Sequence, residues 1–115
     1  TVGEGAWVGV RQKYTWIEAD LSTMFIITGF ATQGRFGIYN QWTTSYQISM
    51  SRSGSVFFFI SNDYGQVIDF SGNSDKNSVV SHELDVPVTA SIVRLHVVTW
   101  HDVPALRWEI YGCQA

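Results

Sequence analysis

The sequence predicts an all-β domain, a sandwich or barrel of roughly eight short antiparallel strands. Apolar residues recur with a period of two along much of the chain, which is the pattern of a half-buried strand. These segments are rich in β-branched and aromatic residues, and Gly, Asn, Asp and Ser separate them. A chain of 115 residues suffices for one hydrophobic core, so we expect a single domain spanning residues 1–115.

Eight segments carry this strand pattern. In the first half of the chain they are residues 16–21, 25–33, 43–51 and 56–61. In the second half they are residues 67–70, 79–84, 91–98 and 106–111. The last segment alternates most clearly, because Leu106, Trp108 and Ile110 share one face and charged or polar residues point to the other. We expect the apolar face of this segment to belong to the core.

Turn residues bound these segments. Residues 52–54, 62–65 and 71–75 contain the Gly, Asn, Asp and Ser that tight turns favour. Pro87 and Pro104 stand where strands begin, so that their missing N–H group leaves the strand ladder intact. The breakers therefore agree with the eight predicted strands.

Composition excludes several functional classes. Seven Lys and Arg stand against ten Asp and Glu, giving a formal net charge of −3, and no basic run occurs. A nucleic-acid binder needs a positive surface, so we expect no nucleic-acid partner. The chain is 45% hydrophobic and 15% aromatic, which is too apolar for a disordered segment.

Motifs for catalysis are absent from the sequence. It contains no phosphate-binding loop, nucleophile elbow, HExxH pair or CxxC pair, so we predict that the protein is not an enzyme. Three histidines remain as candidates for acid–base or metal chemistry, but their spacing matches no known ligand set: His82, His96 and His101. Glu18, Asp20, Arg94, Arg107 and Glu109 lie on or beside strands, where we expect structural ion pairs.

An acidic group of turn residues offers oxygen ligands for a hard cation. It consists of Asp63, Asp69, Asn73 and Asp75, whose spacing matches no EF-hand loop. A structural calcium ion there would lack a supporting motif, so we expect no cofactor and ordinary turn chemistry. Cys113 has no partner in the sequence, and it is either free or pairs outside this chain.

Five ordered segments resemble one known family. They are W-I-E-A-D-L at residues 16–21, T-G-F-A-T-Q-G-R at 28–35, W-T-T-S-Y at 42–46, F-S-G-N-S-D at 70–75 and A-L-R-W-E-I-Y-G-C at 105–113. Together they resemble the discoidin domain, also called the coagulation factor V/VIII type C domain. The stretch at residues 81–84 most resembles the discoidin domains of contactin-associated adhesion proteins.

The resemblance implies an extracellular jelly-roll domain that binds ligands through loops at one end and catalyses nothing. It also implies a disulfide between Cys113 and an opening segment that precedes Gly5 in the family. We therefore expect an N-terminally truncated domain, with a second chain or segment pairing with Cys113 or completing the sheet. Removal of such a disulfide typically costs about 2–5 kcal/mol.

The loop that matches a ligand-binding spike of the family runs from residue 35 to 41. We expect the ligand-binding residues to lie in and beside it: Arg35, Phe36, Ile38, Tyr39, Asn40, Gln41, Trp42, Arg11 and Lys13. Trp42 also matches a structural position at the start of a strand.

Three kinds of ligand fit these residues. An Arg with aromatic neighbours commonly anchors protein interfaces, which favours cell adhesion or protein binding through a cell-surface partner. Aromatic planes with planar polar groups also suit a glycan, as in a lectin. Insertion into an anionic phospholipid membrane comes third, because the net charge is negative and one copy would give only modest affinity.

Overall fold

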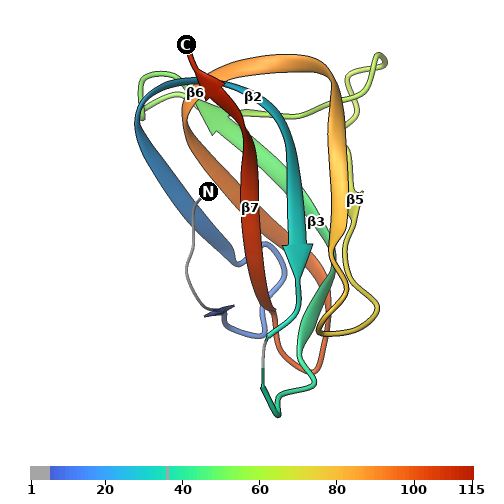
Figure 1. Ribbon diagram of the computed structural model, residues 1–115. Helices are drawn as coiled ribbons and strands as arrows, with labels where there is room; N and C mark the ends of the chain where they lie inside the picture. Colours follow the sequence, from blue (N-terminus) through green and yellow to red (C-terminus); the bar gives the residue numbers. More distant parts are fainter. Residues whose placement is uncertain (1–5, 36) are drawn as a thin grey trace.

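The computed structural model describes residues 6–35 and 37–115 (Figure 1). Its strands are β1 (Trp7–Val8), β2 (Trp16–Gln33), β3 (Trp42–Ser51), β4 (Phe58–Phe59), β5 (Phe70–Ser71), β6 (Val80–His101) and β7 (Ala105–Gln114). All pairings are antiparallel and follow the order β1-β7-β2-β6-β3-β4, with β5 paired to β3. The described residues form no α-helix, and hence no helix long enough to cross a membrane.

The two longest strands run through both layers of a sandwich. The first part of β2, residues 16–20, pairs with residues 92–96 of β6, and β3 pairs with the same part of β6. The second part of β2 lies between residues 80–90 of β6 and β7. Both strands arch over one end of the molecule, at the top of Figure 1. The all-β class and the jelly-roll architecture are confirmed.

The strand boundaries differ from the prediction where turns were expected. Residues 16–21 and 25–33 belong to one strand, because the intervening residues form a bulge. Ser22 has a φ of 68°, and its N–H donates to Asp20 Oδ1 at 2.9 Å, which bends the chain without reversing it. Residues 79–84 and 91–98 likewise join in β6. The predicted strands 56–61 and 67–70 shrink to two-residue pairings, and β1 was not predicted.

The core lies between the two layers. Leu106, Trp108 and Ile110 are buried, which confirms the predicted inner face of β7. Their neighbours in the core come from every long strand and include Ile27, Phe30, Tyr46, Ile48, Leu95 and Val97. One of the predicted ion pairs is present on the outer face, where Arg94 Nε donates to Glu18 Oε1 at 2.8 Å.

Candidate functional site

Four connecting segments meet at the end of the sandwich opposite the chain's C-terminus, at the bottom of Figure 1. They are residues 9–15, 34–35 with 37–41, 73–78 and 101–105, and we call this region the loop end. Backbone and side-chain bonds tie the segments together. Gly9 N donates to Pro104 O at 2.7 Å, and Lys76 Nζ donates to Gly37 O at 2.8 Å. The loop end is therefore a joined surface rather than a set of separate loops.

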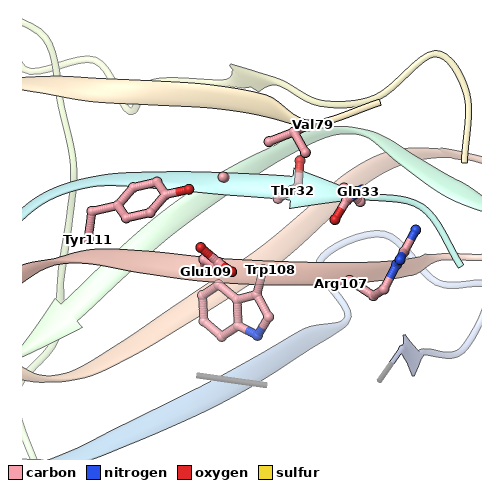
Figure 2. Close-up of a pocket in the computed structure, with 8 residues that line it drawn as sticks. Thr32, Gln33, Val79, Arg107, Trp108, Glu109 and Tyr111 are labelled. Carbon is pink, nitrogen blue, oxygen red and sulfur yellow. The ribbon is translucent and has the colours of Figure 1, made fainter. Parts of the chain in front are cut away.

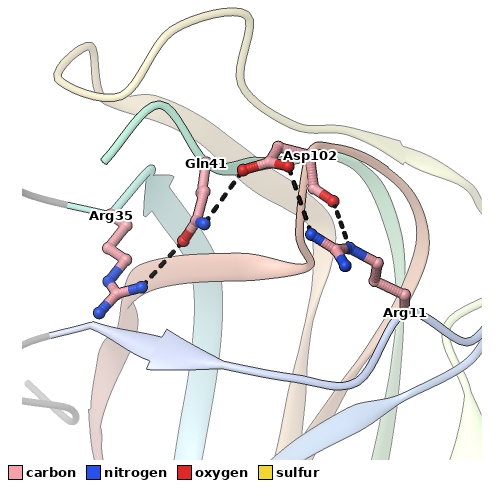
Figure 3. Close-up of polar contacts among 4 residues, drawn as sticks. All are labelled: Arg11, Arg35, Gln41 and Asp102. Carbon is pink, nitrogen blue, oxygen red and sulfur yellow. Dashed lines mark hydrogen bonds and ion pairs between the residues drawn. The ribbon is translucent and has the colours of Figure 1, made fainter. Parts of the chain in front are cut away.

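A chain of polar contacts crosses the loop end (Figure 3). Arg35 Nη1 donates to Gln41 Oε1 at 2.9 Å, and Gln41 Nε2 donates to Asp102 Oδ2 at 3.1 Å. Arg11 completes the chain from the other side, with Nε 2.9 Å from the Asp102 carbonyl and Nη2 3.4 Å from its carboxylate. The amide of Gln41 thus sits between two oppositely charged neighbours and uses both of its ends.

Aromatic and aliphatic side chains stand beside this chain. The Arg35 guanidinium carbon lies 3.5 Å from the centroid of the Tyr39 ring, in a cation–π contact. The Arg35 N–H donates to Gln41 O at 2.9 Å, which closes the loop between them. Ile38 is 87% exposed and Tyr39 is 43% exposed, so an apolar tip faces solvent above a fixed guanidinium.

A shallow groove of about 390 Å³ lies next to this tip. Its lining combines an aromatic ring with polar groups: Asn40, Trp42, Asp75, Lys76, Asn77 and Ser78. The Trp42 ring stacks on His101 with centroids 4.2 Å apart and planes 13° apart. The Asp75 carboxylate accepts from the backbone N–H groups of Asn77 and Ser78, and the Ser78 bonds hold the pKa of Asp75 below its usual value.

Asn73 anchors the groove from below. It is 3% exposed; its Oδ1 accepts from Thr32 Oγ1 at 2.8 Å, and its Nδ2 donates to Thr32 O at 3.0 Å and Ser78 O at 2.8 Å. Gly34 lets the two loops approach, since a Cβ there would stand 2.6 Å from Lys76 Cα. The loops are held by buried bonds to β2 and by close backbone packing.

The predicted ligand-binding residues have three kinds of outcome. Arg11, Arg35 and Gln41 join one network, Ile38 and Tyr39 form the exposed tip, and Asn40 and Trp42 line the groove. Lys13 is exposed and lies over its neighbour Tyr14, with Nζ 5.3 Å from the ring centroid, and within the described residues it forms no hydrogen bond or ion pair with the network. Phe36 lies outside the described residues.

Sequence reasoning missed the partners that come from other loops. Asp102 and Lys76 are brought to the site by the β6–β7 and β5–β6 connections. His101, which the sequence offered only as a candidate for acid–base or metal chemistry, arrives at the end of β6 and stacks on Trp42. The positive φ of Asp102, 65°, is unusual for a residue other than glycine, and no local motif announces it. Asp75 was noticed only as a member of the acidic group, in which it caps its own turn.

A second cavity of about 240 Å³ lies on the outer face of β2 and β7 (Figure 2). Thr32, Gln33, Glu109 and Tyr111 line it, and Arg107 stands at one end. The Arg107 guanidinium donates to the carbonyls of Gly34 and Lys76 at 2.8 and 2.9 Å, so it supports the loop end. Desolvation, aided by the hydrogen bond and charge of Glu109, raises the pKa of Tyr111 above its ordinary value.

The three histidines have separate local partners. His82 Nε2 lies 2.6 Å from Ser71 O, His96 Nε2 lies 2.8 Å from Ser49 Oγ, and His101 stacks on Trp42. Burial, together with the charge of Arg94, lowers the pKa of His96. Within residues 6–35 and 37–115, no group of three His, Cys, Asp or Glu is arranged to hold a metal ion. Asp69 instead accepts from Gln47 Nε2 at 2.7 Å. Cys113 is exposed and unpaired.

Comparison with known proteins places the chain in one family. Residues 1–110 match the family model of the F5/8 type C domain. The chain is 30% identical over 113 residues to coagulation factor V of Pseudonaja textilis, covering 95% of this chain and 8% of that protein. It is 32% identical over 112 residues to neurexin-4 of Drosophila melanogaster, covering 96% of this chain and 9% of that protein.

The fold also matches solved structures. Discoidin II of Dictyostelium discoideum superposes with a TM-score of 0.84 and 27% identity, covering 96% of this chain and 42% of that one. The chain therefore spans less than a tenth of the two curated relatives and under half of this solved chain.

Proposed function

Because the chain belongs to the F5/8 type C, or discoidin, domain family, we propose that it is a non-catalytic extracellular recognition module that mediates cell adhesion or protein binding through its loop end. One observation carries this proposal. Ile38 and Tyr39 form an exposed apolar tip, and the Arg35 guanidinium over the Tyr39 ring is already fixed by Tyr39 and Gln41. Arg and Tyr are the residue types that most often dominate protein interfaces.

Preorganisation is the physical reason this tip suits a protein partner. Immobilising a long side chain on binding costs about 0.5–1.5 kcal/mol, and Arg35 has already lost that freedom in the free protein. Ile38 offers roughly 1.5–3 kcal/mol when it is fully buried, because 87% of it is exposed before binding. The Asp102 carboxylate holds the other end of the Gln41 amide and limits its rearrangement.

A glycan is the second candidate ligand, favoured by the groove beside Trp42. Sugar binding uses an aromatic plane together with a few fixed polar groups. Asn40 and Asn77 present side-chain amides there, and Lys76 is held in place through Gly37. The Trp42 ring is stacked on His101, so the face of the indole that His101 covers is not open to a pyranose.

An anionic membrane has the least support from this geometry. Its binding would rely on free cations near the apolar tip, yet Arg11 is paired with Asp102 and Arg35 is bound to Gln41. The net charge of −3 also opposes attraction to a negative surface.

The proposal is tested with the whole chain, tetramerised and fluorescent, in three parallel arms. Cultured cells, a glycan array and phosphatidylserine vesicles are the three targets. We expect cell binding that protease treatment of the cells removes, with no vesicle signal. A glycan signal that is lost in Asn40→Ala with Asn77→Ala would establish the second candidate instead, and silence in all three arms would overturn both.

A further inference from the structure

A second surface lies away from the loop end, beside β4 and the arch of β6. A groove of about 430 Å³ runs between β4 with the turn that follows it and the arch of β6. That turn and the arch lie at the upper right of Figure 1. Phe58, Ile60 and Ile68 form one wall, and Leu84, Val86 and Val88 form the other. Most of its lining is apolar, which is uncommon for an exposed hollow.

The floor of this groove is the hydrophobic core itself. Phe70 is 7% exposed and packs on Tyr46 with ring centroids 5.6 Å apart. Ile60, Ile68, Leu84 and Val88 pack against the core but remain partly exposed. Phe58 is 41% exposed and Val86 is 74% exposed at the rim. The groove therefore presents apolar surface that is continuous with the protein interior.

The groove lies where β4 is short and the pairing of β6 with β2 is interrupted. β4 is only two residues long, and β6 leaves its register with β2 between the pairs Glu83–Gly29 and Val88–Ile27. Four residues of β6 face a single residue of β2 across this interval, and the last of them is Pro87, which has no N–H to donate. The β6 chain is pushed outward as an arch.

The charges at the rim have one sign. Asp63, Glu83 and Asp85 line the groove and are exposed, while no Lys or Arg lines it. In the part of the chain that the structure describes, none of these three carboxylates has a hydrogen bond or ion pair, unlike Glu18 or Asp102. They do not converge on a metal site either. Their spacing leaves three separate places for cations around an apolar trough.

We propose that this groove binds an extended peptide in which basic and apolar residues alternate. Side chains of an extended strand point alternately to opposite sides, so one set can enter the trough while the other meets the carboxylates. Glu83 and Asp85 are two residues apart on β6, which matches that alternation. The negative rim disfavours an anionic membrane at the same surface. This site is independent of the proposed function at the loop end.

The test uses the whole folded chain and a synthetic fluorescein-labelled peptide of alternating Lys and Val. Fluorescence anisotropy measures its binding and that of two comparison peptides. One comparison peptide alternates Glu and Val. The other contains the same Lys and Val residues, with all Lys in one block and all Val in a second block. We expect binding of the alternating basic peptide that weakens as salt rises, no binding of the acidic peptide, and weaker binding of the block peptide.

Variants locate the binding site. Glu83→Gln with Asp85→Asn should weaken binding about two- to thirtyfold, the range for two exposed charge pairs. Val86→Arg places a cation at the mouth of the groove and should abolish peptide binding. The matched controls Glu109→Gln and Val79→Arg, at exposed positions outside the groove, should bind as the parent does.

The proposal is overturned if the alternating and block peptides bind equally, or if Val86→Arg binds like the parent while its circular dichroism is native. It is also overturned if size-exclusion chromatography shows a dimer that Val86→Arg dissociates, because a second copy would then be the occupant. Arg35→Ala with Tyr39→Ala should leave peptide binding unchanged, which separates this site from the loop end.

Discussion

Asn73 is the residue through which the core supports the loop end, and Asn73→Ala tests that role. The substitution removes three hydrogen bonds, one from Thr32 Oγ1 and two to the carbonyls of Thr32 and Ser78. A net contribution of about 0.5–1.5 kcal/mol per bond gives a loss of about 2–4 kcal/mol in the free energy of unfolding. That loss is a large share of the stability of a small domain.

Urea denaturation followed by Trp fluorescence measures this loss directly, since the chain has five Trp. At roughly 4 °C per kcal/mol, the melting temperature should fall by about 8–16 °C. Asn77→Ala is the matched control, because it removes an exposed amide from the same loop and leaves the backbone carbonyl that Gln33 uses. It should cost less than about 0.5 kcal/mol.

A second variant checks the mechanism. Thr32→Val keeps the shape of the side chain but removes the donor to Asn73, so its cost should overlap with that of Asn73→Ala in the double variant. If Asn73→Ala costs no more than Asn77→Ala, or if the costs of Thr32→Val and Asn73→Ala simply add, the buried bonds do not hold the loop as argued.

Three further predictions concern the core, the outer face and the loop junction. Burial raises the pKa of Tyr46 above its ordinary 10.0, so the folded protein keeps a proton that the unfolded chain loses. The free energy of unfolding should therefore fall as the pH rises above 10. In urea titrations between pH 8 and 11, Tyr46→Phe should show a flatter dependence of stability on pH. Because the pKa of His96 is lowered in the folded protein, the unfolded chain binds this proton first as the pH falls below about 6.5. The free energy of unfolding should therefore drop between pH 7 and 5, and it should drop less in His96→Gln. Equal drops in the two proteins would refute this assignment. Gly34→Ala places a Cβ 2.6 Å from Lys76 Cα and 2.9 Å from Gln41 O. The substitution should therefore lower the free energy of unfolding by about 1–3 kcal/mol. A melting temperature equal to the parent's would show that the two loops are not closely packed there.

The sequence predicted those parts of the fold that depend on local alternation. The inner face of β7 followed from Leu106, Trp108 and Ile110, because burial on one side of a strand imposes a period of two. The continuity of β2 could not be predicted, because Ser22 and Thr23 are residues that suit a turn and a bulge equally well. Whether the chain reverses there is decided by the pairing of Phe25 with β6, a contact distant in the sequence.

The site was predictable in the same limited sense. The segment from Arg35 to Trp42 was recognised through its resemblance to the family and through large apolar residues between strands. Asp102 was not, because it reaches Gln41 only through the pairing of Trp42 with His101 at the start of the β6–β7 turn. Long-range strand register therefore determined which side chains the loop residues meet.

The most direct test of the recognition role is the affinity of the tetramerised chain for cells, compared between two double variants. Arg35→Ala with Tyr39→Ala removes the cation–π pair of the loop end, whereas Arg52→Ala with Tyr64→Ala removes an exposed Arg and an exposed Tyr elsewhere. Loss of about 2 kcal/mol or more at an interface anchor corresponds to at least about a thirtyfold weaker binding. We expect that loss for the first variant and unchanged, protease-sensitive binding for the second; equal binding by both variants would contradict recognition through the loop end.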